Sequence, residues 1–188
     1  MRLIGISGTN GSGKDFAGHL IASQRNFLFM SLTDQLRAEA ERRGMPIDRE
    51  STRTISAEWR RHSGMAVLVD RAVEAFQPTA TQYTGLVIAS LRHPAEAERV
   101  HELGGTVVWM DADPRIRYER ILHANRGRAA EDNKTFEQFL ADDAVEMHPS
   151  GDAATLNMAG VRDLADVTIM NEMTTEELLV ALNQALNL

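Results

Sequence analysis

Residues 8–15 are the part of the chain whose residue types and spacing point most directly to chemistry. They read Gly-Thr-Asn-Gly-Ser-Gly-Lys-Asp and match the phosphate-binding pattern G-x-x-x-x-G-K-[ST] at every defined position except the last. Glycines allow successive backbone N–H groups to turn inward as a nest for anions, and the lysine adds a mobile cation for the outer phosphates. We therefore predict a triphosphate site formed by Gly8, Asn10, Gly11, Ser12, Gly13, Lys14 and Asp15.

The residues on either side of this loop support the prediction. Residues 2–7 are an apolar run short enough for a buried strand, and in residues 14–22 the side chains of Ala17, Leu20 and Ile21 fall at helical spacing. A strand, a glycine-rich loop and a helix in this order are the setting of a P-loop. The alternative is a glycine-rich turn that binds nothing, and the lysine in register and the correct flanks disfavour it.

Asp15 stands where the pattern has a serine or threonine whose hydroxyl contacts Mg²⁺. Mg²⁺ prefers oxygen ligands and usually keeps several waters, so one protein carboxylate can suffice. We predict that Asp15 is a metal ligand and that Asp34 or Asp111 orients a metal-bound water. Because a bare carboxylate would repel the triphosphate, nucleotide binding should depend strongly on Mg²⁺.

The composition limits the class of protein. The chain has 188 residues, of which 43% are hydrophobic and 25% are charged, as in ordinary soluble globular proteins. A formal net charge of −7 argues against a broad nucleic-acid-binding surface, and the absence of cysteine excludes disulfides and thiolate chemistry. No apolar run approaches the roughly 18 residues of a membrane span, and the first strand pattern begins too early to leave room for a signal peptide. We expect a cytoplasmic protein whose partners include neither a nucleic acid nor a membrane.

Short apolar runs alternate with helical patterns along the whole chain. This alternation predicts an α/β fold of three layers, with helices on both faces of a five-stranded parallel sheet, in one domain over residues 1–188. Two parts look like insertions, the long helical region 33–77 and the polar segment 125–134. The predicted strands are residues 2–7, 27–31, 85–90, 106–110 and 167–170. The predicted helices are residues 33–43, 49–62, 65–77, 95–103, 115–124, 136–147 and 175–185, with a shorter one ending at 164.

Arginines follow two of the predicted strands and also lie in the polar segment. Arg37 is in the helix after the second strand, and Arg92 follows the third strand, whose carboxyl end should face the ligand crevice. A guanidinium can neutralise a phosphate dianion through two parallel hydrogen bonds. Each arginine also has a plainer interpretation: a solvated helix face for Arg37, a surface pair with Glu96 for Arg92, and a solvated loop for Arg126 and Arg128.

These segments together resemble the P-loop kinases that phosphorylate nucleoside monophosphates. The match rests on the P-loop, on Ser31, Asp34, Leu36 and Arg37 at the spacing of S-T-G-D-x-L-R, on Ser90-Leu91-Arg92 and on residues 118–128. Within that superfamily the chain is most similar to short adenylate-kinase-related and dephospho-CoA-kinase-like proteins and to deoxynucleoside monophosphate kinases. The resemblance runs from Arg2 to about Ala185.

The resemblance implies a role for each matching part. The helical region 33–77 would bind the acceptor, and residues 125–134 would form a short lid. ATP and Mg²⁺ would be the cofactors, and Arg120 would lie beside the donor base. Catalysis would consist of positioning and charge neutralisation by Lys14, Arg37, Arg92, Arg126 and Arg128.

Two positions depart from the relatives' pattern. Ala89-Ser90 stands where many relatives carry Asp-Gly, so Asp15 would supply the metal ligand missing at position 89. Asp142-Asp143 stands on a helix where relatives often place an arginine, so this side of the lid would be poorer in positive charge, although at least one of the two aspartates belongs on an exposed face.

The arginine pair favours an acceptor that already carries a phosphate. The first expectation is therefore transfer of the γ-phosphoryl group of ATP to a nucleoside or deoxynucleoside monophosphate, a small phosphorylated partner. One alternative is dephospho-CoA, whose ribose hydroxyl would call for a general base such as Asp34. The other alternative, which the altered metal positions suggest, is a nucleotide-binding regulatory protein without turnover.

Overall fold

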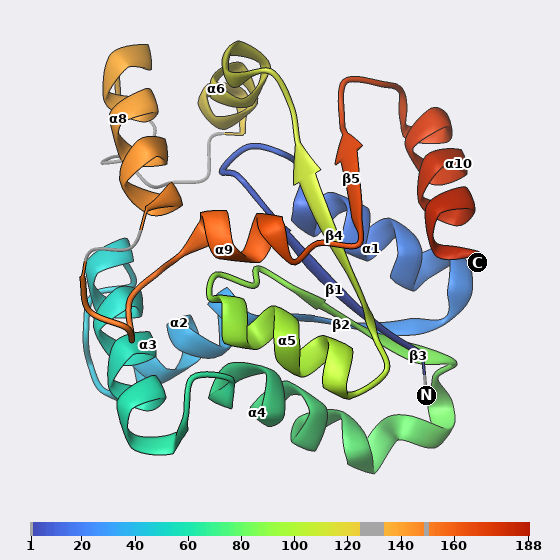
Figure 1. The fold of residues 1–188 in the computed structure, drawn as a ribbon, viewed down its shortest axis with the longest axis horizontal. Coiled ribbons are helices and arrows are strands. Elements are labelled where there is room, and N and C mark those ends of the chain that lie inside the picture. The colour runs from blue at the N-terminus through green and yellow to red at the C-terminus, as the bar shows by residue number, and fades with distance from the viewer. Residues whose placement is uncertain (1, 125–133, 149–150) are drawn as a thin grey trace.

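The computed structural model describes residues 2–124, 134–148 and 151–188, and it contains a parallel sheet of five strands in the order β2-β3-β1-β4-β5 (Figure 1). Every neighbouring pair of strands in this sheet runs parallel. The predicted fold class is therefore confirmed. The strands are β1 Arg2–Gly8, β2 Phe27–Ser31, β3 Gly85–Ala89, β4 Thr106–Asp111 and β5 Val167–Met170.

Helices cover both faces of the sheet, which is why its central strands are almost continuously apolar. On one face, Leu86 and Trp109 pack with side chains of α2, α3, α4, α5 and α9. On the other face, Ile4 and Ile6 pack with Ile21 of α1 and with leucines of α10. The helices are α1 Lys14–Arg25, α2 Leu32–Arg42, α3 Arg49–Ser63, α4 Val67–Phe76, α5 Pro94–Glu102, α6 Pro114–His123, α8 Phe136–Met147, α9 Met158–Asp163 and α10 Thr175–Leu186.

The predicted helix over residues 65–77 is the boundary that differs most. It begins at Val67, and after Phe76 the chain continues as a 3₁₀-helix, η1 Gln77–Gln82, which the sequence analysis did not predict. Pro78 lies at the start of η1 and has no N–H with which to continue α-helical hydrogen bonding. No helix in the described ranges is both long and apolar enough to cross a membrane.

Parallel strands bring their carboxyl ends to one edge of the sheet, and the chain order makes a crevice there. From β1 the chain passes to β2 and β3 on one side, and then crosses to β4 and β5 on the other side of β1. Ligands of open α/β sheets bind at such a switch point. The loop after β1, the segment after β3 and the carboxyl end of β4 therefore meet at this edge (Figure 1).

Candidate active site

The P-loop runs from the carboxyl end of β1 into the first turn of α1, in the predicted order of strand, loop and helix. Gly11 and Gly13 adopt left-handed backbone conformations, with φ of 81° and 85°. A Cβ at Gly11 would lie 2.5 Å from the carbonyl oxygen of Arg117, and one at Gly13 would collide with the side-chain amide of Asn171. Glycine is thus required at both positions by conformation and by close approach.

The amino terminus of α1 is available to an anion. Its N-cap residue is Gly13, which has no side chain to cap the N–H groups of the first turn, and these groups lie at the positive end of the helix dipole. The hydroxyl of Ser12 is buried and has no hydrogen-bond partner among the described residues. Lys14, at 8% exposure, lines the cleft beside the loop. This donor set fits the oxygens of a polyphosphate.

A buried arginine of α6 ties the loop to its surroundings. Arg117 is 4% exposed and donates through Nη1 to the carbonyl of Asn10 at 3.2 Å and through Nε to the carbonyl of Ala112 at 3.0 Å. Its Nη1 and Nη2 also donate to both carboxylate oxygens of Asp143 on α8, at 3.1 and 2.9 Å. One guanidinium therefore joins the P-loop, the turn after β4 and α8. Arg117 was not among the predicted site residues, and no local sequence pattern marks it.

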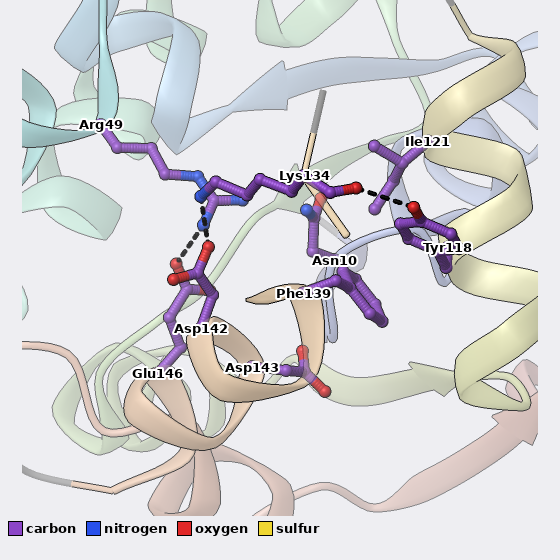
Figure 2. Close-up of a pocket in the computed structure, with 9 residues that line it drawn as sticks. All are labelled: Asn10, Arg49, Tyr118, Ile121, Lys134, Phe139, Asp142, Asp143 and Glu146. Atoms are coloured by element: carbon purple, nitrogen blue, oxygen red, sulfur yellow. Dashed lines mark hydrogen bonds and ion pairs between the residues drawn. The ribbon is translucent and has the colours of Figure 1, made fainter. Parts of the chain in front are cut away.

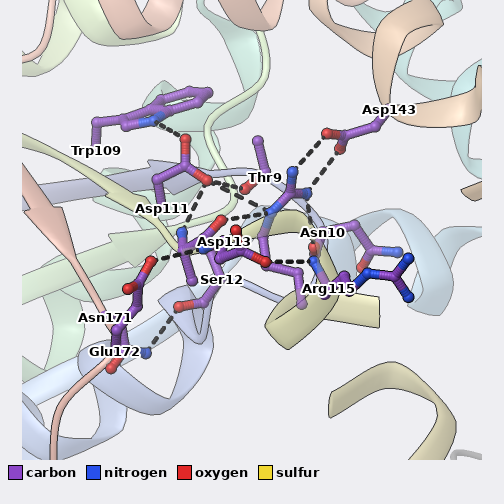
Figure 3. Close-up of polar contacts among 12 residues, drawn as sticks. Thr9, Asn10, Ser12, Trp109, Asp111, Asp113, Arg115, Asp143, Asn171 and Glu172 are labelled. Atoms are coloured by element: carbon purple, nitrogen blue, oxygen red, sulfur yellow. Dashed lines mark hydrogen bonds and ion pairs between the residues drawn. The ribbon is translucent and has the colours of Figure 1, made fainter. Parts of the chain in front are cut away.

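Asp111, at the end of β4, holds the loop from another side (Figure 3). It accepts from the hydroxyl of Thr9 at 2.8 Å and from the N–H of Ala112 at 2.9 Å, and it lies 3.5 Å from Arg117. Its carboxylate holds Thr9 and the turn after β4 in place. That Asp111 orients a metal-bound water stays a prediction.

The segment after β5 also contacts the loop. The side-chain amide of Asn171 donates to the carbonyl of Ser12 at 2.8 Å (Figure 3). Arg120 of α6 donates through Nη2 to the carbonyl of Asn171 at 2.8 Å, while its buried Nη1 has no partner in the part of the chain that the structure describes. Arg120, predicted to lie beside the donor base, is therefore connected to the P-loop backbone through Asn171.

A cleft of about 930 Å³ opens at this edge of the sheet, which is a suitable size for small-molecule ligands. It gathers predicted residues from several elements: the P-loop, α2 and the segment after β3. Gly8, Gly11, Ser12, Gly13 and Arg120 are not among the residues that line it. The predicted residues on its wall are Asn10, Lys14, Asp15, Asp34, Arg37 and Arg92.

The candidate metal residues contribute carboxylates but no preformed cage. Asp15 is exposed and accepts from the hydroxyl of Ser90 at 3.3 Å, at the end of β3 where Ala89 offers no ligand. Asp34, with its side chain 63% exposed, pairs with Arg37 at 2.7 Å. In the described ranges no cluster of three or more His, Asp or Glu side chains is arranged to hold a metal ion. Mg²⁺ that arrives with a nucleotide fits this donor set, because phosphates and water can supply its other ligands.

Arg92 has a different partner from the one that the plainer interpretation gave it. Glu96 accepts from the backbone N–H groups of Arg92 and His93, and its carboxylate forms a buried pair with Arg60 at 2.7 Å. The side chain of Arg92 donates instead to Glu146 of α8 at 3.0 Å. Glu96 is engaged in this way because its carboxylate lies in the core, where a buried charge needs a close counter-ion.

Glu146 accepts from two further arginines, both on α3. Arg49 donates through Nη1 at 3.1 Å and Arg53 through Nη2 at 2.9 Å (Figure 2 shows Arg49 and Glu146). Burial raises the pKa of Glu146, but Arg92, Arg49 and Arg53 outweigh it and lower the pKa to about 2. Glu146, Arg49 and Arg53 were not among the predicted site residues. The spacing of Arg49 and Arg53, one helical turn apart, is the available signal.

The predicted lid lies almost wholly outside the described residues, and so do Arg126 and Arg128. Lys134, its last position, is described and pairs with Asp142, beside a second cavity of only about 20 Å³ (Figure 2). Asp142 is partly exposed and Asp143 is held by Arg117, so the two neighbouring aspartates serve different partners.

The comparisons with known proteins agree with this architecture. Residues 4–141 match the family described as an AAA domain. A UPF0200 protein of Pyrobaculum aerophilum is 30% identical over 179 residues, which cover 94% of this chain and 91% of that protein.

Solved structures of small-molecule kinases share the fold. Shikimate kinase from Bacteroides thetaiotaomicron superposes with a TM-score of 0.63 at 16% identity, covering 99% of this chain and 98% of that one. A gluconokinase from Sinorhizobium meliloti gives a TM-score of 0.52 at 18% identity, covering 98% and 89%. At these identities the likeness concerns the fold alone. This chain belongs to the AAA-domain family, together with the UPF0200 proteins and within the P-loop superfamily of NTPases and kinases.

Proposed function

We propose that this protein is an ATP-dependent phosphotransferase that transfers the γ-phosphoryl group to a nucleoside or deoxynucleoside monophosphate. The observation that supports this best is the shared cleft. Lys14 of the P-loop and the arginines Arg37 and Arg92 line the same space, although they come from three parts of the chain. A cleft with a triphosphate-binding loop and separate guanidinium groups suits two phosphorylated substrates.

The proposed roles follow from position. The P-loop backbone and Lys14 hold the donor phosphates, and Arg37 and Arg92 attract the acceptor's phosphate. Mg²⁺, when bound, supplies further neutralisation of phosphate charge, and Asp15 is the residue that would hold it. In this proposal residues 1–188 form one kinase domain, in which region 33–77 binds the acceptor and segment 125–134, with Arg126 and Arg128, covers it. Arg120 lies on the side of the donor nucleotide.

Dephospho-CoA remains a second candidate acceptor because Asp34 lines the cleft. Phosphorylation of its ribose hydroxyl requires a group that accepts a proton, and a carboxylate in the cleft suits that task. Asp34 pairs with Arg37 at 2.7 Å, however, so its carboxylate already has a cationic partner. The monophosphate acceptor needs no such base and is therefore the preferred proposal.

The test is a coupled assay of ADP release with Mg·ATP and a panel of acceptors. The panel holds AMP, CMP, UMP, GMP, their deoxy forms and dephospho-CoA. Stimulation by one or more monophosphates supports the proposal, and stimulation by dephospho-CoA alone favours the second candidate. Tight ATP binding with no stimulated ADP release by any of them would contradict both and favour a regulatory nucleotide-binding protein.

A further inference from the structure

Glu146 is a single carboxylate surrounded by three guanidinium groups. Arg49, Arg53 and Arg92 approach its two oxygens at 3.1, 2.9 and 3.0 Å. The Glu146 side chain is 7% exposed, whereas those of the three arginines are 27, 45 and 23% exposed. The cluster is therefore closed around its anion but can still be reached from the cleft, which all four residues line.

The charges of this cluster do not balance. Among the described residues, Glu146 is the ion-pair partner of both Arg53 and Arg92, so one carboxylate with a 7% exposed side chain meets two permanent cations from these residues alone. A phosphate dianion offers more charge and more acceptor oxygens than a carboxylate, and guanidinium groups suit its geometry. The cluster therefore has the composition of a phosphate site in which a side chain of the chain itself provides the anion.

The nearby pair Arg60–Glu96 shows what a purely structural ion pair looks like here. Its side chains are 1% and 0% exposed, one cation meets one anion, and Arg60 also donates to the carbonyl of Ala154 at 3.1 Å. The Glu146 cluster differs in both respects, because its cations are in excess and remain partly exposed. A structural counter-ion alone does not require either property.

We propose that Arg49 and Arg53 belong with Arg92 to the subsite for the acceptor's phosphate and that Glu146 occupies this subsite until the acceptor displaces it. This inference rests on the proposed function and specifies it further. Phosphate binding becomes an exchange of one anion for another. Acceptors without a phosphate dianion cannot compensate for the loss of Glu146 from the cluster, so Glu146 selects against uncharged and singly charged acceptors.

Inorganic phosphate is the probe, and its affinity is measured by calorimetry for paired variants. Glu146→Gln removes the competing charge and should bind phosphate about tenfold more tightly. This factor is expected if the state in which Glu146 has left the arginines makes up about a tenth of the wild-type population and nearly all of the variant's. Asp142→Asn is the matched control, because it removes one negative charge from the same helix but pairs with Lys134 rather than with the cluster. It should bind phosphate as the wild type does.

The arginines are tested in the same way. Arg53→Gln should lower phosphate affinity and, combined with Glu146→Gln, should abolish its gain. Arg61→Gln is the control on the same helix, because Arg61 pairs with Asp152 outside the cluster. Since the P-loop also binds phosphate, the gain of Glu146→Gln should persist in a Lys14→Ala background, where phosphoryl transfer is lost.

If Glu146→Gln is too unstable for calorimetry, the single variant Arg53→Gln still tests whether this cluster binds phosphate. Its melting temperature should rise less with added phosphate than that of Arg61→Gln. Equal phosphate affinity of Glu146→Gln and wild type, or a gain that does not need Arg53, would overturn the inference. A gain that depends on Arg53 in a protein that phosphorylates no acceptor would support the anion site and contradict the kinase proposal instead.

Discussion

Arg92 donates to Glu146 at 3.0 Å across 54 residues of sequence, and this contact joins the segment after β3 to α8 at the wall of the cleft. The guanidinium that the family resemblance assigned to the acceptor's phosphate therefore already holds an anion. The P-loop is held by a comparable long-range contact, because Arg117 connects Asn10 to Asp143. Both contacts end on α8, so this helix helps to position both the P-loop and the arginine at the wall of the cleft.

Replacing Lys14 with alanine should abolish phosphoryl transfer without unfolding the protein. Lys14 lines the cleft at the start of α1, where it adds positive charge next to the phosphate-binding backbone. Loss of one preorganised charged donor typically lowers kcat by roughly 100- to 1000-fold. Steady-state kinetics measure the effect, and an unchanged circular dichroism spectrum controls for folding. Wild-type turnover of Lys14→Ala would contradict the assignment of the P-loop.

Replacing Asp15 with asparagine should weaken the response to Mg²⁺. If the carboxylate ligates the metal, the variant should need at least about tenfold more Mg²⁺ for half-maximal activity, which is the usual scale of loss when a metal's surroundings are changed. Asp15→Ser restores the hydroxyl of the usual pattern, so its Mg²⁺ requirement should rise less than that of Asp15→Asn. The measurement is a Mg²⁺ titration of initial rates. Normal Mg²⁺ dependence and turnover in Asp15→Asn would refute a metal-binding role.

Replacing Arg117 with glutamine should destabilise the fold as well as the loop. The side chain is 5% exposed, and its loss leaves the 16%-exposed Asp143 side chain without its cation. Removing one partner of a buried pair costs about 3–5 kcal/mol. Arg115→Gln is the control on the same helix, because the Arg115 guanidinium lies over the face of Phe136, a contact worth about 1 kcal/mol or less, and near the carboxylate of Glu137. Urea unfolding measures both, and equal losses would argue against Arg117 as a brace.

Acid should unfold the wild type more steeply than Glu146→Gln. The folded-state pKa of Glu146 is about 2, against 4.5 as its ordinary value, so the group stabilises the fold above pH 4.5 and loses this contribution as the pH falls toward 2. The shift corresponds to a stabilisation on the order of 3 kcal/mol at neutral pH. Free energies of unfolding measured by denaturant across this range should converge for the two proteins at low pH. A constant difference would contradict the prediction.

The P-loop and the layered fold could be predicted because their signals are local. Gly8 to Asp15 is one contiguous pattern, and each strand shows as a short apolar run between helical periodicities. The predicted helix 65–77 ends earlier in the structure, where Pro78 has no N–H to continue α-helical hydrogen bonding. The positions of Lys14, Arg37 and Arg92 on one cleft also followed from the rule that parallel strands present their carboxyl ends at one edge.

The partners of these residues could not be predicted in the same way. Glu146 meets Arg49 and Arg53 across 97 and 93 residues, and these contacts depend on how α3 and α8 are placed in the fold. The burial of Arg117 likewise depends on the packing of α6 against the loop. Local propensity carries no information about such distances, so Arg92 could be predicted as a site residue but its carboxylate partner Glu146 could not.

The most direct test of the account follows the γ-phosphoryl group itself. Wild-type protein is incubated with Mg²⁺, γ-³²P-labelled ATP and each monophosphate, and the products are separated by chromatography. The account predicts label in the diphosphate of at least one nucleoside or deoxynucleoside monophosphate, and loss of that product in Lys14→Ala and in Arg92→Gln. Label that remains in ATP, or that appears only as inorganic phosphate with every monophosphate, would contradict the proposed phosphotransferase.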